Sequence, residues 1–261
     1  MPSALNIARS GLEALDARLR TISNNLANAN TVGFKRDRAS FETLLYQTSR
    51  PGGAPQGADA RFGMGLSTGA GVRIAGTERV HSQGGFTTTG NALDLAIDGE
   101  GLFEVTLPDG RAAFTRAGAL TRNAEGLIVT PQGYTLAPGL QLPEGATGIT
   151  VGSDGTVSAQ LPGEAAPTQV GQITLTAFIN PAGLEPIGEN LYLESGSSGA
   201  PLPGAPGSNG LGRIRQGSLE NSNVSSVQEL VELIETQRAY EINSKVISAA
   251  DEMMRYVNQA V

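Results

Sequence analysis

Hydrophobic residues near the N-terminus recur at alternating spacings of three and four. They lie at Leu5, Ala8, Leu12, Leu15, Leu19, Ile22 and Leu26. A mean period of about 3.5 predicts an α-helix with one apolar seam that packs against a neighbouring helix. Gly33 is a suitable residue to end this helix. Gly11 inside it costs about 1 kcal/mol relative to alanine.

The last segment of the chain also has the pattern of a long helix. It opens with Ser225 and Gln228 at the spacing of a capping box and continues to Val261 without proline or glycine. Its apolar stripe passes through Val227, Val231, Ile234, Ile242, Val246, Ala249, Met253, Tyr256 and Ala260, with Arg238 at the one polar step. We therefore expect the two terminal helices to pack on each other as a coiled-coil-like base.

Between the helices the hydrophobic period changes to that of β-strands. Leu93, Leu95 and Ile97 alternate with polar or small residues, and similar short runs continue to about residue 195. Turn-forming pairs separate these runs at Asp98-Gly99, Asp109-Gly110, Glu125-Gly126 and Gln132-Gly133. The pattern predicts a central antiparallel all-β domain, so that the fold class is mixed α and β.

Two stretches have the composition of linkers. Residues 49–71 and 195–212 are rich in glycine, proline, serine and alanine, and they contain too few apolar residues for a core of their own. They flank the β domain on both sides. The predicted organisation is a terminal helical region at 1–45 and 213–261, extended linkers at 46–75 and 195–212, and a β domain at 76–194.

Composition narrows the classes of function. The chain has 261 residues, enough for one large domain or two modest ones, and no cysteine, which excludes disulfides and thiolate chemistry. A net charge of −7 argues against a nucleic-acid partner or an anionic membrane surface. No apolar run has the length of a signal peptide or a membrane span, so the ordinary expectation is a soluble cytoplasmic protein.

The sequence offers few groups for catalysis or metal binding. His81 is the single histidine, and its position beside Gln83 and Gly84 is more typical of a structural or exposed residue than of a general base. Asp94, Asp98 and Glu100 lack the spacing of a calcium loop, so we interpret them as turn and surface residues. We predict no enzyme activity, no metal and no cofactor.

Two further motifs have simple interpretations. The glycines of "GMGLSTGAG" (63–71) are not followed by the Gly-Lys-Ser/Thr of a phosphate loop, which favours a linker. Lys35, Arg36 and Arg38 alternate with Asp37 and have no aromatic residue interleaved among them, so a solvated or subunit-contact surface is favoured over a nucleic-acid site.

Asparagines are concentrated at the end of the N-terminal helix. Four of them, Asn24, Asn25, Asn28 and Asn30, fall within seven residues, although asparagine is a poor helix former. Their face lies beside the apolar seam, and half-buried asparagines can fix the register between helices. This pattern favours self-assembly over the alternative that the two helices pack only within one monomer.

Four segments resemble the family of flagellar rod and hook proteins. They are "NNLANANTVGFKRDRASFETLLYQ" (24–47), "GTERVHSQGGFTTTGNALDLAIDGEGLFEV" (76–105), "IGENLYLESGSSGAP" (187–201) and "QRAYEINSKVISAADEMM" (237–254). The resemblance covers nearly the whole chain in the expected order. It implies a structural subunit that polymerises into a helical tube, transmits torque from motor to hook and encloses an export channel.

Within this family the chain is most similar to the distal rod members. Its length is shorter than that of hook proteins, and "YQTSRPGGAPQGADARFGMGLSTGAGV" (46–72) occupies the place of a rod-specific segment. The resemblance implies that this segment packs between neighbouring subunits and stiffens the rod. The alternatives are a proximal rod or hook-type subunit, a secreted β-domain binding module, and a small β-domain hydrolase.

The resemblance also implies partners and a location. Self, proximal rod, hook and ring proteins and the flagellar type III export apparatus are the expected partners, with no nucleic acid and no membrane insertion. The expected location is the flagellar basal body, where the rod crosses the periplasm, after export without a cleavable signal peptide. No cofactor is implied.

Two groups of residues are the candidate sites. For polymerisation and helix packing they are Leu5, Leu12, Leu15, Leu19, Ile22, Asn24, Asn25, Leu26, Asn28, Val231, Ile234, Arg238, Tyr240, Glu241, Ile242, Asn243 and Val246. For the rod-specific segment they are Tyr46, Gln47, Pro51, Gly52, Gly53, Pro55, Gly63 and Gly65. We expect the asparagine amides to bind adjacent subunits.

Overall fold

A computed structural model describes residues 2–52, 63–163 and 166–259. It contains two compact units, which we call the helical unit and the β unit. The helical unit comprises Met1–Leu26, Asp37–Glu78 and Ser225–Val261. The β unit comprises Ala27–Arg36 and Arg79–Val224. Because each unit is built from separated stretches of sequence, the chain passes repeatedly from one to the other.

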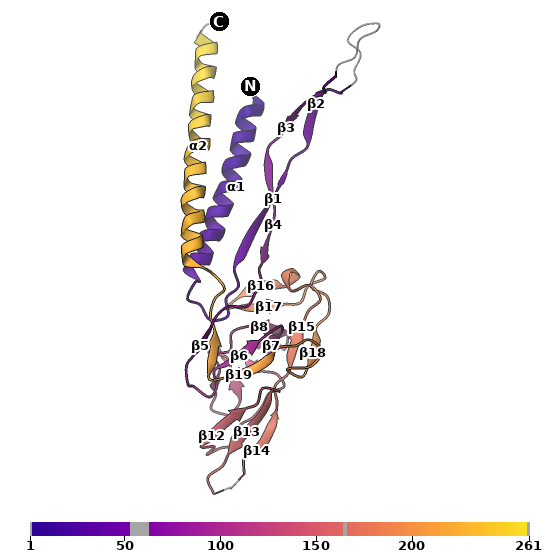
Figure 1. Cartoon of the computed structure of the whole chain (residues 1–261), viewed down its shortest axis with the longest axis vertical. Helices are drawn as coiled ribbons and strands as arrows, with labels where there is room; N and C mark the ends of the chain where they lie inside the picture. Colours follow the sequence, from indigo (N-terminus) through magenta and orange to yellow (C-terminus); the bar gives the residue numbers. More distant parts are fainter. Residues whose placement is uncertain (1, 53–62, 164–165, 260–261) are drawn as a thin grey trace. The chain divides into compact units, whose positions relative to one another are not determined.

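Both predicted terminal helices are confirmed, and they lie side by side in antiparallel directions (Figure 1). α1 spans Pro2–Ala27 and α2 spans Ser226–Gln259. α2 begins directly after the predicted capping residue Ser225, whose carbonyl accepts the Glu229 N–H at 3.0 Å. α1 ends before Gly33, because the residues that follow Ala27 form turns.

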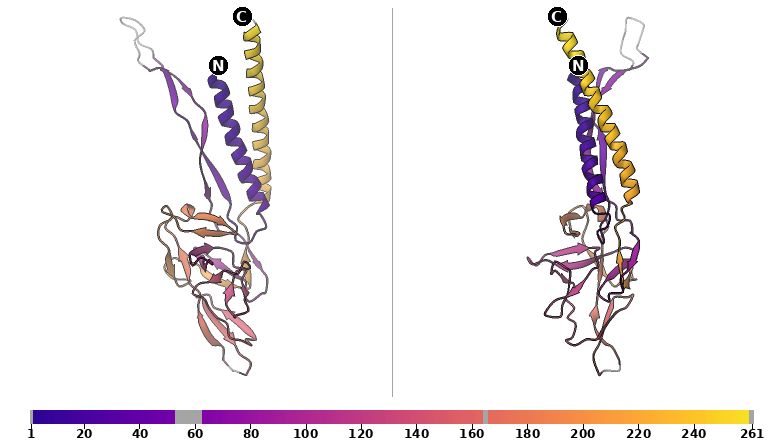
Figure 2. Two further views of the ribbon diagram at one scale, coloured as in Figure 1. Left: turned by 180° about the vertical axis from the view of Figure 1, so that it is seen from behind. Right: turned by 90° about the vertical axis from the view of Figure 1, so that its left-hand side faces the viewer.

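The other described residues of the helical unit, 37–52 and 63–78, form a two-part β-ribbon (Figure 2). β1 (Asp37–Thr43) pairs with β4 (Val72–Arg79), and β2 (Tyr46–Arg50) pairs antiparallel with β3 (Leu66–Gly69). Within the predicted helical region 1–45, the helix itself ends at Ala27, and residues 37–43 form a strand. The described parts of the predicted linker at 46–75 are extended but paired, because ladder hydrogen bonds order a segment that has no core of its own.

The β unit contains short strands and one turn of 3-10 helix. In chain order they are β5 (Phe86–Thr88), β6 (Leu95–Asp98), β7 (Leu102–Thr106), β8 (Ala112–Thr115), β9 (Thr121–Arg122), β10 (Ile128–Val129), β11 (Thr135–Leu136), β12 (Gly148–Val151), β13 (Thr156–Gln160), β14 (Thr168–Gln172), β15 (Leu175–Ala177), η1 (Pro181–Gly183), β16 (Glu185–Gly188), β17 (Leu191–Leu193), β18 (Leu202–Gly204), β19 (Arg213–Gln216) and β20 (Ser218–Glu220). The central sheet has the order β16-β17-β8-β7-β11-β10-β9, and β15 pairs with both β7 and β18. Smaller sheets are β12-β13-β14, β19-β6 and β20-β5. The named pairings in this unit are antiparallel, as predicted.

The predicted turns at Asp109-Gly110, Glu125-Gly126 and Gln132-Gly133 are confirmed as hairpin connections. They join β7 to β8, β9 to β10 and β10 to β11. The glycine of each pair has a positive φ, which residues with a Cβ rarely adopt. Local turn chemistry therefore sets the register of this part of the sheet.

The core of the β unit lies on both faces of the central sheet. Phe103 and Val105 belong to a large buried cluster, whereas the adjacent Leu102 belongs to a second cluster with Phe114 and Phe178. The alternation of β-strand side chains accounts for this division. The Phe114 and Phe178 rings meet edge to face, with centroids 4.8 Å apart.

The predicted boundaries at the C-terminal end of the β domain need correction. Residues 195–212, predicted to be a linker, contribute β18 to the central sheet and the buried Leu211 to its core. Residues 213–220, predicted to belong to the helical region, form β19 and β20.

Candidate functional site

The two helices contact each other through polar side chains. Asn243 of α2 donates a hydrogen bond to the Ala8 carbonyl of α1 at 2.9 Å. Arg18 and Glu232 form an ion pair at 3.6 Å. A Cβ at Gly11 would lie 2.8 Å from Asn243 Nδ2, so Gly11 leaves the space that this asparagine occupies. Gly11 lowers the intrinsic stability of α1, but it lets Asn243 of α2 approach the α1 backbone.

Asn25 lies at one end of this polar contact, near the end of α1, and is 1% exposed. Its amide pairs with both backbone groups of Asp37: Nδ2 donates to the carbonyl, and Oδ1 accepts the N–H, each at 2.9 Å. Nδ2 also lies 3.2 Å from a carboxylate oxygen of Glu229, which is fully buried. Asn25 thus joins α1, β1 and α2 within one chain. These hydrogen bonds use both hydrogens of the Asn25 amide within the chain, and the expectation that the asparagine amides bind an adjacent subunit stays a prediction.

Replacing Asn25 by alanine should destabilise the helical unit by about 2 kcal/mol. The substitution removes three hydrogen bonds at a buried position, including one to a buried carboxylate. Hydrogen exchange of α1 amides in the purified full chain measures the loss. Asn24→Ala is the matched control, because Asn24 is exposed and an exposed substitution changes stability by less than about 0.5 kcal/mol. Equal exchange in the two variants would contradict the role of Asn25.

Most of the predicted apolar stripe of α2 faces away from α1. Glu229 and Thr236 are buried and seven residues apart, whereas the stripe residues Val231 and Ile234 are 51% and 48% exposed. At roughly 100° per residue, Val231 and Ile234 lie on the side of α2 opposite Glu229. Val227, Ile242, Val246, Met253 and Tyr256 are also exposed. We call these residues the α2 stripe.

The other predicted positions on the helices differ in burial. On α1, Ile22 is buried, and Leu5, Leu12, Leu15, Leu19 and Leu26 are half-buried. On α2, Arg238, Tyr240 and Glu241 are exposed. An open groove of about 550 Å³ is lined by Ile7, Ala8, Gly11, Gly71, Val72, Asn243 and Val246. The described part of the helical unit therefore leaves apolar surface on both helices.

The ribbon also exposes apolar side chains. Leu45 is 89% exposed and Met64 is 83% exposed, and Tyr46 and Leu66 are exposed as well. Among the predicted rod-specific residues, Tyr46 and Gln47 lie in β2, and Pro51, Gly52, Gly63 and Gly65 lie at the described end of the ribbon. Gly53 and Pro55 lie outside the described residues.

The β unit contains a buried ionic cluster that sequence analysis missed. Lys35 donates to Glu220 Oε1 at 2.7 Å, and Arg116 donates through Nε to Glu220 Oε2. The side chains of Lys35, Arg116 and Glu220 are 2%, 6% and 0% exposed. The interpretation of Lys35 as a surface cation is wrong, because the turn after α1 directs it into the β unit.

Backbone groups complete the cluster. Arg116 Nη2 donates to the carbonyls of Ile97 at 2.9 Å and Gly99 at 2.6 Å. Lys35 also donates to the Ser82 carbonyl at 2.7 Å, and Glu220 accepts the Gly84 N–H at 2.9 Å. These backbone hydrogen bonds and the ion pairs together compensate the loss of hydration that burial imposes on the three charges.

The cluster shifts the pKa values of its members. Burial lowers the pKa of Lys35, and the hydrogen bond to Glu220 opposes that shift. Burial alone would raise the pKa of Glu220, but Arg116 and the hydrogen bond from Lys35 hold it below its usual value. Glu220 is therefore ionised at neutral pH and balances the two cations.

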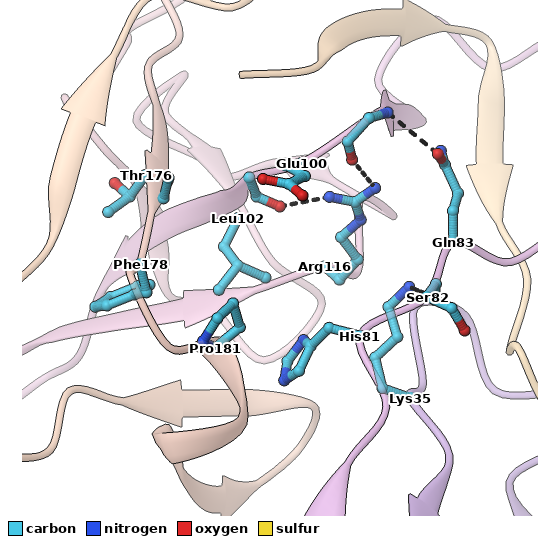
Figure 3. Close-up of a pocket in the computed structure, with 13 residues that line it drawn as sticks. Lys35, His81, Ser82, Gln83, Glu100, Leu102, Arg116, Thr176, Phe178 and Pro181 are labelled. Atoms are coloured by element: carbon cyan, nitrogen blue, oxygen red, sulfur yellow. Dashed lines mark hydrogen bonds between the residues drawn. The ribbon is translucent and has the colours of Figure 1, made fainter. Parts of the chain in front are cut away.

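A pocket of about 300 Å³ lies beside this cluster (Figure 3). Lys35, His81 and Arg116 line one part of it, and Leu102, Phe178 and Pro181 line another. Burial and the charges of Lys35, Arg79 and Arg116 lower the pKa of His81 to about 4. His81 is thus neutral at pH 7, and Nε2 is buried with no hydrogen-bond partner in the described part of the chain.

The arrangement around His81 is unsuited to acid–base catalysis. Its charged neighbours are cations, which oppose the imidazolium that a general base must form.

Within residues 2–52, 63–163 and 166–259, no group of three or more His, Cys, Asp or Glu side chains could hold a metal ion. The helices described in these ranges are too short or too polar to cross a membrane. Asp94, interpreted as a surface residue, is buried and accepts a hydrogen bond from Asn91 at 2.9 Å.

Three family models match parts of the chain. The flagella basal body rod protein model matches residues 5–35, and the flagellar hook protein FlgE/F/G D1 domain model matches residues 96–159. The flagellar basal body rod FlgEFG protein C-terminal model matches residues 215–260. The first and last cover most of α1 and α2, and the second covers part of the β unit.

Relatives align along nearly the whole chain. The flagellar basal-body rod protein FlgG of Buchnera aphidicola subsp. Schizaphis graminum is 45% identical over 259 residues, covering 99% of this chain and all of the relative. FlgG of Caulobacter vibrioides is 47% identical over 257 residues, covering 98% of each chain. FlgF of the same organism is 36% identical over 262 residues, covering 98% of this chain and 96% of the relative.

Proposed function

The chain belongs to the FlgG family of flagellar basal-body rod proteins, a structural and not an enzymatic family, and we propose that it self-assembles through its terminal helices into the distal rod. Sequence identity supports the distal over the proximal assignment. Within Caulobacter vibrioides, FlgG is 47% identical to this chain and FlgF 36%. The rod so formed transmits torque from motor to hook and encloses a channel for export.

The observation that carries this proposal is the α2 stripe. Seven large side chains on one side of a single helix are exposed, with Val227 and Tyr256 each at 74%. Exposing this much aligned apolar surface is unfavourable in an isolated subunit. A second copy of the chain that covers the stripe, through contacts that do not close into a ring, generates a helical filament.

We also propose what the remaining candidate residues do in the rod. The half-buried leucines of α1 and the α2 stripe pack with helices of neighbouring copies in coiled-coil fashion. Exposed Asn24 and half-buried Asn28 fix register there, whereas Asn25 acts within the chain. Tyr46, Leu66 and their neighbours on the ribbon pack between subunits and stiffen the rod.

The proposed partners follow from a rod that crosses the periplasm. Besides further copies of itself, the chain contacts proximal rod, hook and ring proteins and the flagellar type III export apparatus. The exposed apolar side chains of the ribbon, such as Leu45 and Met64, support this proposal, because other chains can cover them.

Replacing Ile234 by glutamate should raise the lowest concentration that supports assembly by at least about tenfold. A charge in the middle of the α2 stripe would be desolvated in the filament but solvated in the monomer. Negative-stain microscopy and sedimentation of the purified full chain measure filament formation. In cells lacking their own copy of the gene, the same variant should fail to restore rods.

The matched control is Gln237→Glu, which makes the same acidic side chain at an exposed position away from the stripe. Filaments from the control and none from Ile234→Glu support the proposal. If the Ile234→Glu variant assembles as well as the original chain, the α2 stripe is not the polymer interface. If the original chain forms no rods in either assay, the proposed function is overturned.

A further inference from the structure

All sulfur atoms of this chain are methionine thioethers. The sequence has no cysteine and four methionines, at positions 1, 64, 253 and 254. Where thiolates are present, oxidants such as hydrogen peroxide attack them readily. In this chain the same oxidants act on the methionines, and the exposure of each thioether decides which of them reacts.

Two adjacent methionines of α2 differ in their surroundings. Met253 is 54% exposed, whereas Met254 is half-buried. Consecutive helical residues point about 100° apart, so the two side chains leave the helix in different directions. Met253 lies two turns from Val246 and one turn from Tyr256, both of which are exposed on the same side of the helix. Its thioether is therefore part of the accessible surface of the α2 stripe.

Oxidation would change the chemistry of this surface at one position. A lone pair of the Met253 sulfur attacks one oxygen of hydrogen peroxide, an S–O bond forms, and the O–O bond breaks. The second oxygen leaves and takes up a proton to become water. The sulfur has lost two electrons, and the peroxide has gained them. The product is a sulfoxide, whose polar oxygen replaces an apolar surface.

We propose that Met253 is a modification site at which oxidation by peroxide prevents assembly through the α2 stripe. The inference rests on the proposed function, in which a second copy of the chain covers this stripe. The sulfoxide oxygen is hydrated in the monomer and would lose that hydration in the filament. The coupling is reciprocal, so assembly protects Met253 from oxidation to the extent that oxidation opposes assembly.

The test uses the purified full chain with Met64→Leu, because Met64 on the ribbon is 83% exposed and would otherwise be oxidised as well. Monomers are treated with hydrogen peroxide, and mass spectrometry of peptides gives the oxidation rate at each methionine. Met253 should react at least about threefold faster than Met254. The lowest concentration that supports assembly should rise about fivefold, and treatment with methionine sulfoxide reductases should reverse this change.

Met253→Leu and Met254→Leu, each combined with Met64→Leu, form the matched pair. Leucine keeps an apolar side chain of similar volume but cannot be oxidised. Peroxide should leave the assembly of the Met253→Leu chain unchanged and should impair the Met254→Leu chain as it does the Met64→Leu chain. In preformed filaments of the Met64→Leu chain, oxidation of Met253 should be about tenfold slower than in monomers.

Three results would overturn the modification site. They are equal oxidation rates of Met253 and Met254 in monomers, equal impairment of the two matched variants, and a loss of helical circular dichroism in the oxidised monomer. If untreated chains assemble and oxidised chains assemble equally well, this inference fails while the proposed function stands. If untreated chains form no rods, the proposed function fails and this inference fails with it.

Discussion

Replacing Glu220 by glutamine is expected to lower the free energy of unfolding of the β unit by about 3–5 kcal/mol. Glutamine keeps the size of the side chain but removes the charge that balances Lys35 and Arg116, both of which are buried. Removing one partner from a buried ion group costs this much, because the remaining charges stay desolvated without compensation. The loss is a large fraction of the stability of an ordinary domain.

Urea unfolding followed by pulsed hydrogen exchange in β7 and β8 measures this change. Glu100→Gln is the matched control, since Glu100 lines the same pocket but is exposed. The control should change stability by less than about 0.5 kcal/mol. A second substitution, Lys35→Met in the Glu220→Gln background, should restore part of the loss because it removes one uncompensated cation. A loss below about 1 kcal/mol for Glu220→Gln would mean that the cluster does not stabilise the fold.

Acidification from pH 7 to pH 5 should destabilise the β unit by about 2 kcal/mol through His81 alone. Burial and the nearby cations Lys35, Arg79 and Arg116 depress the pKa of His81 from 6.5 to about 4 in the folded chain. The unfolded chain therefore binds a proton first as the pH falls, and stability present above pH 6.5 is lost progressively toward pH 4. The full depression corresponds to about 3 kcal/mol.

The chain has one histidine, so a histidine-dependent loss of stability between pH 7 and pH 5 is assigned to His81. Glu220, whose pKa is held below its usual value, titrates below this window. Urea unfolding at pH 7, 6 and 5 should show a steady decline for the original chain and a nearly constant value for His81→Gln. A variant that retains the decline, or an original chain equally stable at pH 7 and pH 5, would contradict the assignment of a neutral buried histidine.

Local sequence patterns were sufficient to predict the two helices and the hairpin turns, because local interactions largely determine these elements. The seam of α1 and the stripe of α2 identified two helices, because an apolar period near 3.6 has no other regular interpretation over such lengths. The Asp-Gly, Glu-Gly and Gln-Gly pairs identified three hairpins through the φ that glycine alone adopts freely. The four segments quoted in the sequence analysis were sufficient to identify the family.

Only the tertiary structure determined which side of a helix faces its neighbour within the chain. The stripe of α2 predicted contact with α1, but the hydrogen bonds of Asn25 and Asn243 place the opposite side of α2 there. Periodicity reports that a helix has an apolar side, and it cannot report whether the same chain or another copy covers that side.

The buried ionic cluster is the clearest feature that local sequence patterns could not predict. Lys35, Arg116 and Glu220 are separated by up to 185 residues, and each of them alone is typical of a surface position. Only the pairing of distant strands brings them together and supplies the backbone carbonyls that make burial of the cations possible. The sequence by itself therefore determined the helices, the turns and the family, whereas the packing of distant segments determined the ionic cluster and the side of α2 left exposed.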